Sequence, residues 1–406
     1  MTIMRRWLII LFLFLVQQAV CQPLYEHRGV QYATHGTDFW FGLPRDHNGI
    51  SEDHACMYVI AEHDCTVTIR NDLLGYVQTK NITGSTEINS RLDTLNFIEL
   101  PKNIIYGIEY LSSNIPVGNQ QPAYGPQPRA FHLTSTDTIT AFIFSYSNGN
   151  IDVTNLLPTE MLRDEYVVQS YPNYGIPDPN HNPFGLNMGY FEVVATEDST
   201  VIDIQLGGTD WMDRTPDSVI TIVLDRGMMF YDQIGDWCHV YPDCCRFPGV
   251  DPADAPPACD TVTKTTLAYR FPIDPTIDTF IYSNNLSGTY IKARDNKRIA
   301  VFQGNQTLHV GNAGYSDFAL EEALPIRYAG TEFLIPNLMT SKEDYIQFTG
   351  LVDGTTLTIT NTSSTPMATH SVNLDARRSY WFVMDIDEGP FYITATHPIL
   401  VSDYSC

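Results

Sequence analysis

Apolar and polar residues alternate along most of the chain, in short runs rich in Val, Ile, Thr, Tyr and Phe. Gly, Pro, Asn and Asp separate these runs. A period of two puts alternate side chains on opposite faces of an extended strand, and β-branched and aromatic residues favour that conformation. We find no convincing amphipathic helix. The pattern therefore predicts an all-β protein.

Two segments share one ungapped pattern of Leu-Pro, an intervening stretch, Glu and an aromatic residue. They are "LPTEMLRDEY" (Leu157–Tyr166) and "LPIRYAGTEF" (Leu324–Phe333). Asp38-Phe39, within "GTDFWFGLP", fills the acid–aromatic position in a first copy. We therefore expect three tandem copies of one β module, starting near residues 36, 160 and 325. The acid–aromatic pairs should start equivalent strands.

Further blocks follow in the same order within each copy. The second block carries Asp-x-Thr between two apolar runs, at Asp64, Asp198 and Asp353. It predicts a hairpin whose Asp bonds to the backbone of its own turn. The third block is "ITIVLDRGMMFY" and "HSVNLDARRSYWF", with "SRLDTLNFIEL" as a poorer first copy. The fourth is a strand, a polar turn and an apolar strand: "FHLTSTDTITAFIFS", "YIKARDNKRIAVFQG" and "YITATHPILVSDYS".

The N-terminal segment has the pattern of a secretory signal peptide over residues 1–21. Arg5 and Arg6 precede the apolar run Trp7–Val16, and cleavage is expected after Cys21, with lipidation of Cys21 as the alternative. No later apolar run is long enough to predict a transmembrane segment. The remaining chain divides into β module one (22–155), module two (156–320, with a Cys-rich insertion at about 232–280) and module three (321–406). We expect three sandwich-like modules packed together; a strand-swapped or pseudo-threefold arrangement is the alternative.

Charge excludes one class of partner. The 406 residues carry 47 Asp and Glu against 23 Lys and Arg, a formal net charge of −24. A phosphate backbone would be repelled by such a field, so nucleic-acid binding is not expected. At 43% hydrophobic residues the chain is globular rather than disordered.

Export to an oxidising compartment favours disulfides over free thiols. Cys56 and Cys65 flank one strand and its turn, which predicts a local bond between them. The Pro- and Asp-rich insertion holds four more candidates for two internal bonds, with zinc on these thiols and His239 as the alternative: Cys238, Cys244, Cys245 and Cys259. Cys406 is left over and is available for an intermolecular bond.

Other candidate chemistry is weak. No nucleophile elbow, zinc protease motif, P-loop or dinucleotide fingerprint is present. The acidic turns Thr209–Asp213 and Asp385–Gly389 offer oxygen ligands for calcium but fit no EF-hand pattern. Five early histidines are interpreted as surface or turn residues, with metal binding as the alternative: His27, His35, His47, His54 and His63. We therefore predict no cofactor and no catalytic residue.

Four sequons could accept N-linked glycans in a eukaryotic secretory pathway. They begin at Asn81, Asn285, Asn305 and Asn361. Only exposed asparagines can be modified.

The ordered blocks carry a resemblance to a known family. "GTDFWFGLP", "LPTEMLRDEYVVQSYP", "FEVVATEDSTVIDI", "GTYIKARDNKRIAVFQG", "ALPIRYAGTEFLIP" and "YITATHPILVSDYS" together resemble the N-terminal domain of the IgGFc-binding protein family, over about residues 34–405. The resemblance implies a secreted or cell-surface β-rich module for binding and adhesion, not an enzyme. It provides no residue-level motif for antibody Fc binding, so no ligand-binding residue is carried over.

These observations favour a non-enzymatic extracellular module that recognises a protein or a glycan. Two alternatives stay open. One is a secreted glycan hydrolase that uses paired carboxylates. The other is a structural matrix or mucus component that forms oligomers through Cys406.

Overall fold

The computed structural model describes residues 33–43, 54–84, 96–105, 125–147, 150–171, 189–210, 212, 214–233, 285–308, 310, 317–336, 343–363, 368–385 and 389–405. By their contacts, residues 34–406 form one compact unit. Helix in the described part is confined to α2 (Lys102–Ile105) and short 3₁₀ turns that include η4 (Arg294–Asn296) and η5 (Ile326–Tyr328). The predicted all-β fold is confirmed.

Module one is organised by one long strand, β7 (Phe131–Ser147), at the centre of a seven-stranded sheet. Its first half pairs with β1 (Gly36–Phe41) on one side and β3 (Cys65–Asn71) on the other. Its second half pairs with β2 (His54–Ala61) and β8 (Asn150–Asn155). The sheet is completed by β4 (Tyr76–Ile82) beside β3 and β5 (Phe97–Glu99) beside β2.

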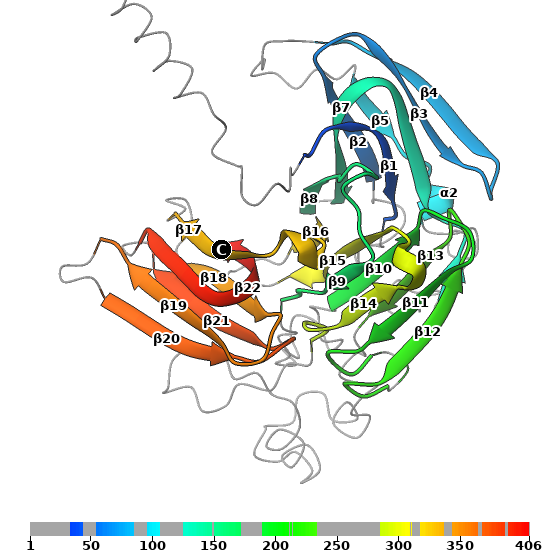
Figure 1. Ribbon diagram of the computed structural model, residues 1–406. Helices are drawn as coiled ribbons and strands as arrows, with labels where there is room; N and C mark the ends of the chain where they lie inside the picture. The colour runs from blue at the N-terminus through cyan, green and yellow to red at the C-terminus, as the bar shows by residue number, and fades with distance from the viewer. Residues whose placement is uncertain are drawn as a thin grey trace, which may run out of the picture. The chain divides into compact units, whose positions relative to one another are not determined.

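Module three repeats this plan around the long strand β22 (Phe391–Ser405). The first half of β22 pairs with β17 (Gly330–Ile335) and β19 (Thr355–Asn361), and its second half pairs with β18 (Glu343–Gly350). β20 (Ala368–Leu374) lies beside β19, and β21 (Ser379–Asp385) beside β18. Figure 1 shows these strands in orange and red and those of module one in blue and teal.

Module two divides the long strand in two. β14 (Tyr290–Ala293) and β15 (Ile299–Leu308) are separated by η4 and lie in different sheets. β14 pairs with β9 (Glu165–Val167) and β11 (Thr200–Gln205), and β12 (Val219–Leu224) completes that sheet.

The second sheet of module two contains β15, β10 (Gly189–Ala195), β13 (Met229–Gln233) and β16 (Asp317–Glu322). A short strand contributed from the chain of module one, β6 (Gly125–Gln127), pairs with β13. Apolar side chains from both sheets form one buried cluster, in which Ile204 and Ile291 of the first meet Phe191 and Val301 of the second. Two facing sheets with a shared core are a β-sandwich.

Strand register confirms the predicted repeat. Asp38 lies opposite Thr134, Glu165 opposite Lys292, and Glu332 opposite Thr394, so the three acid–aromatic pairs hold the same place beside the long strand. Just before each pair, one residue bridges to an isoleucine further along that strand: Gly36 to Ile139, Arg163 to Ile299, and Gly330 to Ile399. The module boundaries at residues 155 and 320 stay a prediction.

The predicted hairpin of the second block is wrong. Its two strands do not pair with each other, because the short turn carries the chain from one half of the long strand to the other, as from β2 to β3. The turn aspartates therefore bond to a neighbouring turn rather than to their own. Asp64 accepts from the backbone N–H of Gly84, Asp198 from Arg226 and Asp353 from Ala376. The repeated Asp thus joins two connections between strands in each module.

Candidate functional site

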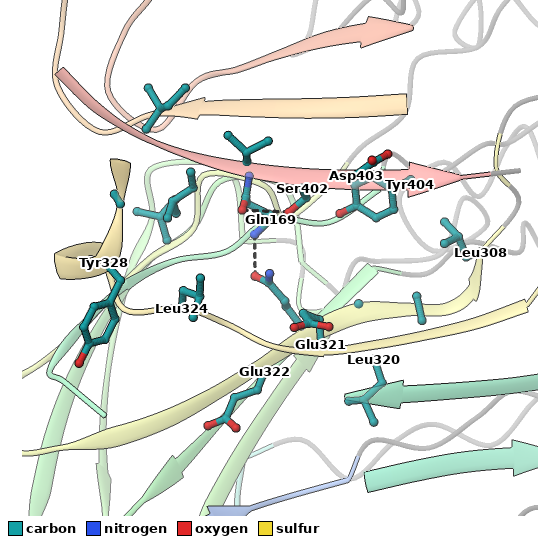
Figure 2. A pocket seen from close by; sticks show the side chains of 18 of the residues that line it. Gln169, Leu308, Leu320, Glu321, Glu322, Leu324, Tyr328, Ser402, Asp403 and Tyr404 are labelled. Atoms are coloured by element: carbon teal, nitrogen blue, oxygen red, sulfur yellow. Dashed lines mark hydrogen bonds between the residues drawn. The ribbon is translucent and has the colours of Figure 1, made fainter. Parts of the chain in front are cut away.

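A cavity of about 450 Å³ opens between modules two and three. Its walls come mainly from β15 and β16 of module two and from the second half of β22. Figure 2 shows these strands and the side chains between them. A volume in the range of about 300–1,000 Å³ is typical of ligand pockets.

Polar side chains join the two walls around Gln169, which follows β9. Its backbone N–H donates to Oε1 of Gln303 on β15 (2.7 Å), and its Oε1 accepts from the Ser402 hydroxyl on β22 (3.0 Å; Figure 2). Its Nε2 donates to Thr349 on β18 (3.2 Å). One glutamine therefore contacts both modules through its amide and its backbone.

The cavity wall is also acidic. Glu321 on β16 and Asp403 on β22 keep contact with water, yet the surrounding protein removes much of their hydration. Burial, aided by the nearby charge of Asp152, raises the pKa of Glu321 to about 7. Burial, aided by Asp344, raises the pKa of Asp403 to about 6. At pH 7 Glu321 is therefore about half protonated and can donate or accept a hydrogen bond, whereas Asp403 is mostly ionised.

Glu322, next to Glu321, lies on the other side of the strand. It is 2% exposed, and its Oε2 accepts from the backbone N–H of Leu157 (2.7 Å), in the linker that follows β8. Burial raises its pKa well above the ordinary value. Its contact with the linker makes it a positioning residue for the junction of modules one and two.

Among the described residues, none of the site residues predicted from the sequence lines this cavity. Cys56 and Cys65 are both free thiols, which corrects the predicted bond between them. Cys56 lies five residues before the end of β2, and a strand rises about 3.3 Å per residue, so the strand carries Cys56 away from the turn that leads to Cys65. The other candidates, Cys238, Cys244, Cys245, Cys259 and Cys406, lie outside the described residues.

The four sequons have different environments. Asn81 is exposed on β4. Asn305 is completely buried and exchanges hydrogen bonds with the backbone of Tyr171, accepting at 3.2 Å and donating at 3.0 Å. Asn285 and Asn361 are 6% and 9% exposed, and each bonds to the serine of its own sequon. A glycan is a bulky surface group, so the structure leaves Asn81 as the accessible candidate.

We expect the chain, secreted from eukaryotic cells, to carry a glycan on Asn81 and none on Asn305. Glycopeptide mapping by mass spectrometry measures both sites. Thr83→Ala should remove the Asn81 glycan without changing the asparagine. A glycan on Asn305 of the folded protein would contradict the burial described above.

Only some of the candidate metal ligands lie among the described residues. Asp210, in the first acidic turn, is fully buried and pairs with Arg214. The second acidic turn lies mostly outside the described residues, as do His27 and His47. Within the described part of the chain, no group of three or more His, Cys, Asp or Glu side chains is arranged to hold a metal ion.

Aligned strand positions contain a signal for the cavity that sequence reasoning missed. Ser402 and Asp403 lie three and four residues after the bridging residue Ile399 of module three. Phe142 and Ile143 lie at the same distances after Ile139 of module one, so the two pairs hold equivalent places. Module two has Gln303 in the place of Asp403, so a polar residue at this position marks both long strands that line the cavity, whereas module one has Ile143 there. Recognising this position requires the strand register, which the sequence blocks did not define.

Fold and site together define an all-β protein of repeated sheet modules with a polar cavity between two of them. The family model described as IgGFc binding protein matches residues 152–406, more than half of the chain, and the chain therefore belongs to this family. The match covers modules two and three, which form the cavity, whereas the expected resemblance began near residue 34. No curated protein matches the chain.

The family is one of binding proteins, typically extracellular, and is not a known enzyme family. Among the described residues, no helix has the length and apolar character needed to cross a membrane.

Proposed function

We propose that this protein acts outside the cell as a non-enzymatic binding and adhesion protein that recognises another protein. The observation that carries the proposal is the coincidence of the family match with the cavity. Residues 152–406 include both modules that form it. Its wall combines apolar side chains such as Leu320 and Phe333 with hydrogen-bonding groups such as Gln169 and Asp403, a mixture suited to a polypeptide.

The direct test is binding of the purified, secreted full chain to an array of extracellular proteins, including immunoglobulin Fc, and of glycans. We expect saturable binding to a protein that leaves the bound protein covalently unchanged, as checked by mass spectrometry. Cleavage of a glycan by catalytic amounts of the chain would support the hydrolase alternative instead.

A second measurement separates binding from a purely structural role. Cys406→Ser should bind the same array protein as the unchanged chain. Oligomers that require Cys406, without binding to any array component, would support the matrix alternative and contradict the proposal.

A further inference from the structure

The long strands of the three modules differ in what lies along their second halves. In modules one and two, the strand that follows in the chain turns back and pairs there: β8 with residues 142–147 of β7, and β16 with β15. In module three, β18 pairs with one side of residues 399–405. Among the described residues, no strand pairs with residues 400–405 on the other side.

The cavity lies along this open edge. Six consecutive residues of β22, Ile399–Tyr404, line it. Because neighbouring side chains point to opposite faces of a strand, an unbroken run of lining residues means that the cavity faces the edge of β22. Gly330, at the start of β17, lines the same cavity on the side where β8 and β16 lie in the other modules.

The other modules show which backbone groups face this edge. The N–H of Leu156 donates to the carbonyl of Ala141, and that of Ala323 donates to Val301, both at 2.8 Å. Val401 holds the same place, two residues after the bridging isoleucine. In an antiparallel strand the N–H and C=O of one residue point to the same side, and alternate residues repeat the pattern. The backbone groups of Val401 and Asp403 therefore face the cavity.

Side chains around the edge indicate what would bind there. Asp403 holds the place that faces Thr154 in module one and Glu321 in module two. Asp152, Glu321 and Asp403 line the cavity, so it is complementary to a cation. Leu320, Leu324 and Phe333 supply an apolar surface on either side.

We propose that the open edge of β22 binds an extended segment of a partner protein as an added antiparallel strand, with a lysine or arginine side chain opposite Asp403. This inference rests on the proposed function and specifies its binding mode. Strand addition provides affinity through backbone hydrogen bonds and specificity through alternate side chains. The chain itself contains an added strand of this kind, since β6 pairs with β13 in the sheet of module two.

The probe is a synthetic peptide with the sequence of the strand that fills this place in module one, Asn150–Leu157, and with lysine in the place of Thr154. A matched peptide carries glutamate there. We expect the lysine peptide to bind the full chain about tenfold more tightly than the glutamate peptide, measured by fluorescence anisotropy. With Asp403→Lys the preference should reverse, while Glu62→Lys, in an exposed turn, should leave it unchanged.

Two further measurements test the backbone contact itself. N-methylation of the peptide amides in the places of Thr154 and Leu156 removes the donors that face β22 and should abolish binding. N-methylation of the amide in the place of Val153, which points away from β22, should weaken binding less. Hydrogen exchange at the Val401 and Asp403 amides should slow when the lysine peptide binds. Equal binding of the methylated peptides, no binding of the lysine peptide, or unchanged exchange would each overturn the proposal.

Failure of the strand-addition proposal can be distinguished from failure of the proposed function. If an array protein binds but Asp403→Lys and the peptide leave that binding unchanged, the protein is a binder that uses another surface. If the peptide binds as described and no array protein does, the strand-addition site stands and the proposed function fails.

Discussion

Replacing Glu192 with glutamine is expected to stabilise the protein at neutral and alkaline pH, by about 3 kcal/mol at pH 7. Glu192 lies in the middle of β10, is completely buried, and has no hydrogen-bond partner for either carboxylate oxygen among the described residues. Burial raises its pKa to about 8, and the charge of Arg129 only partly opposes the shift. The folded protein therefore holds Glu192 neutral at pH 7, whereas the unfolded chain ionises it.

The direction in which stability changes with pH follows from proton binding by Glu192. Between the ordinary pKa of 4.5 and the raised value of about 8, the folded state binds more protons than the unfolded state. Stability is therefore highest below the ordinary pKa and decreases as pH rises through this window. Glutamine has nearly the same shape and no proton to release, so the variant should lose this part of the pH dependence.

Urea unfolding at pH 5 and pH 8 measures the effect. The difference in the free energy of unfolding between variant and unchanged protein should be small at pH 5 and large at pH 8. Glu62→Gln, in the exposed turn after β2, is the control and should leave the pH profile unchanged. A variant no more stable than the unchanged protein at pH 8 would show that Glu192 is ionised and paired in solution.

Replacing Arg214 with methionine is expected to destabilise the protein by about 3 kcal/mol at pH 8. Its guanidinium contacts two fully buried carboxylates, Asp210 through Nε and Asp232 on β13 through Nη2 (3.1 Å). Without Arg214 two negative charges would share a site from which water is excluded. The arginine side chain is itself 33% exposed, so we expect the lower end of the range for buried pairs.

The dependence on pH identifies the origin of this loss. Burial raises the pKa of Asp232 well above its ordinary value, and the neighbouring Asp210 raises it further, while Arg214 opposes both. In Arg214→Met, Asp232 should take up a proton more readily, so the destabilisation should shrink at pH 5. A loss of equal size at both pH values would assign the effect to packing instead.

Arg294→Met is the matched control for Arg214→Met. Arg294 pairs with Asp203 through two hydrogen bonds of 2.8 Å, but both side chains reach solvent. Exposed ion pairs contribute little to stability. The thermal midpoint of Arg294→Met should therefore stay close to that of the unchanged protein.

The sequence by itself determined the all-β class, the three copies and the place of the acid–aromatic pairs. Each depends on short-range patterns, because alternation reports the two faces of one strand and a repeated block reports a repeated local environment. Asp38, Glu165 and Glu332 were found because the same neighbours surround them. The repeated aspartates were also found, but their partners lie in another turn, more than twenty residues away in the case of Asp198 and Arg226.

Tertiary structure alone decided the site. Cys56 and Cys65 are close in sequence but separated by an extended strand, and Asn305 has a sequon but a buried amide. Glu321 and Asp403 meet across a cavity although 82 positions separate them in the chain. The open edge of β22 is defined by a strand that is present in modules one and two and has no counterpart among the described residues of module three. Pairing between strands is a long-range property, so it is absent from any local pattern of residues.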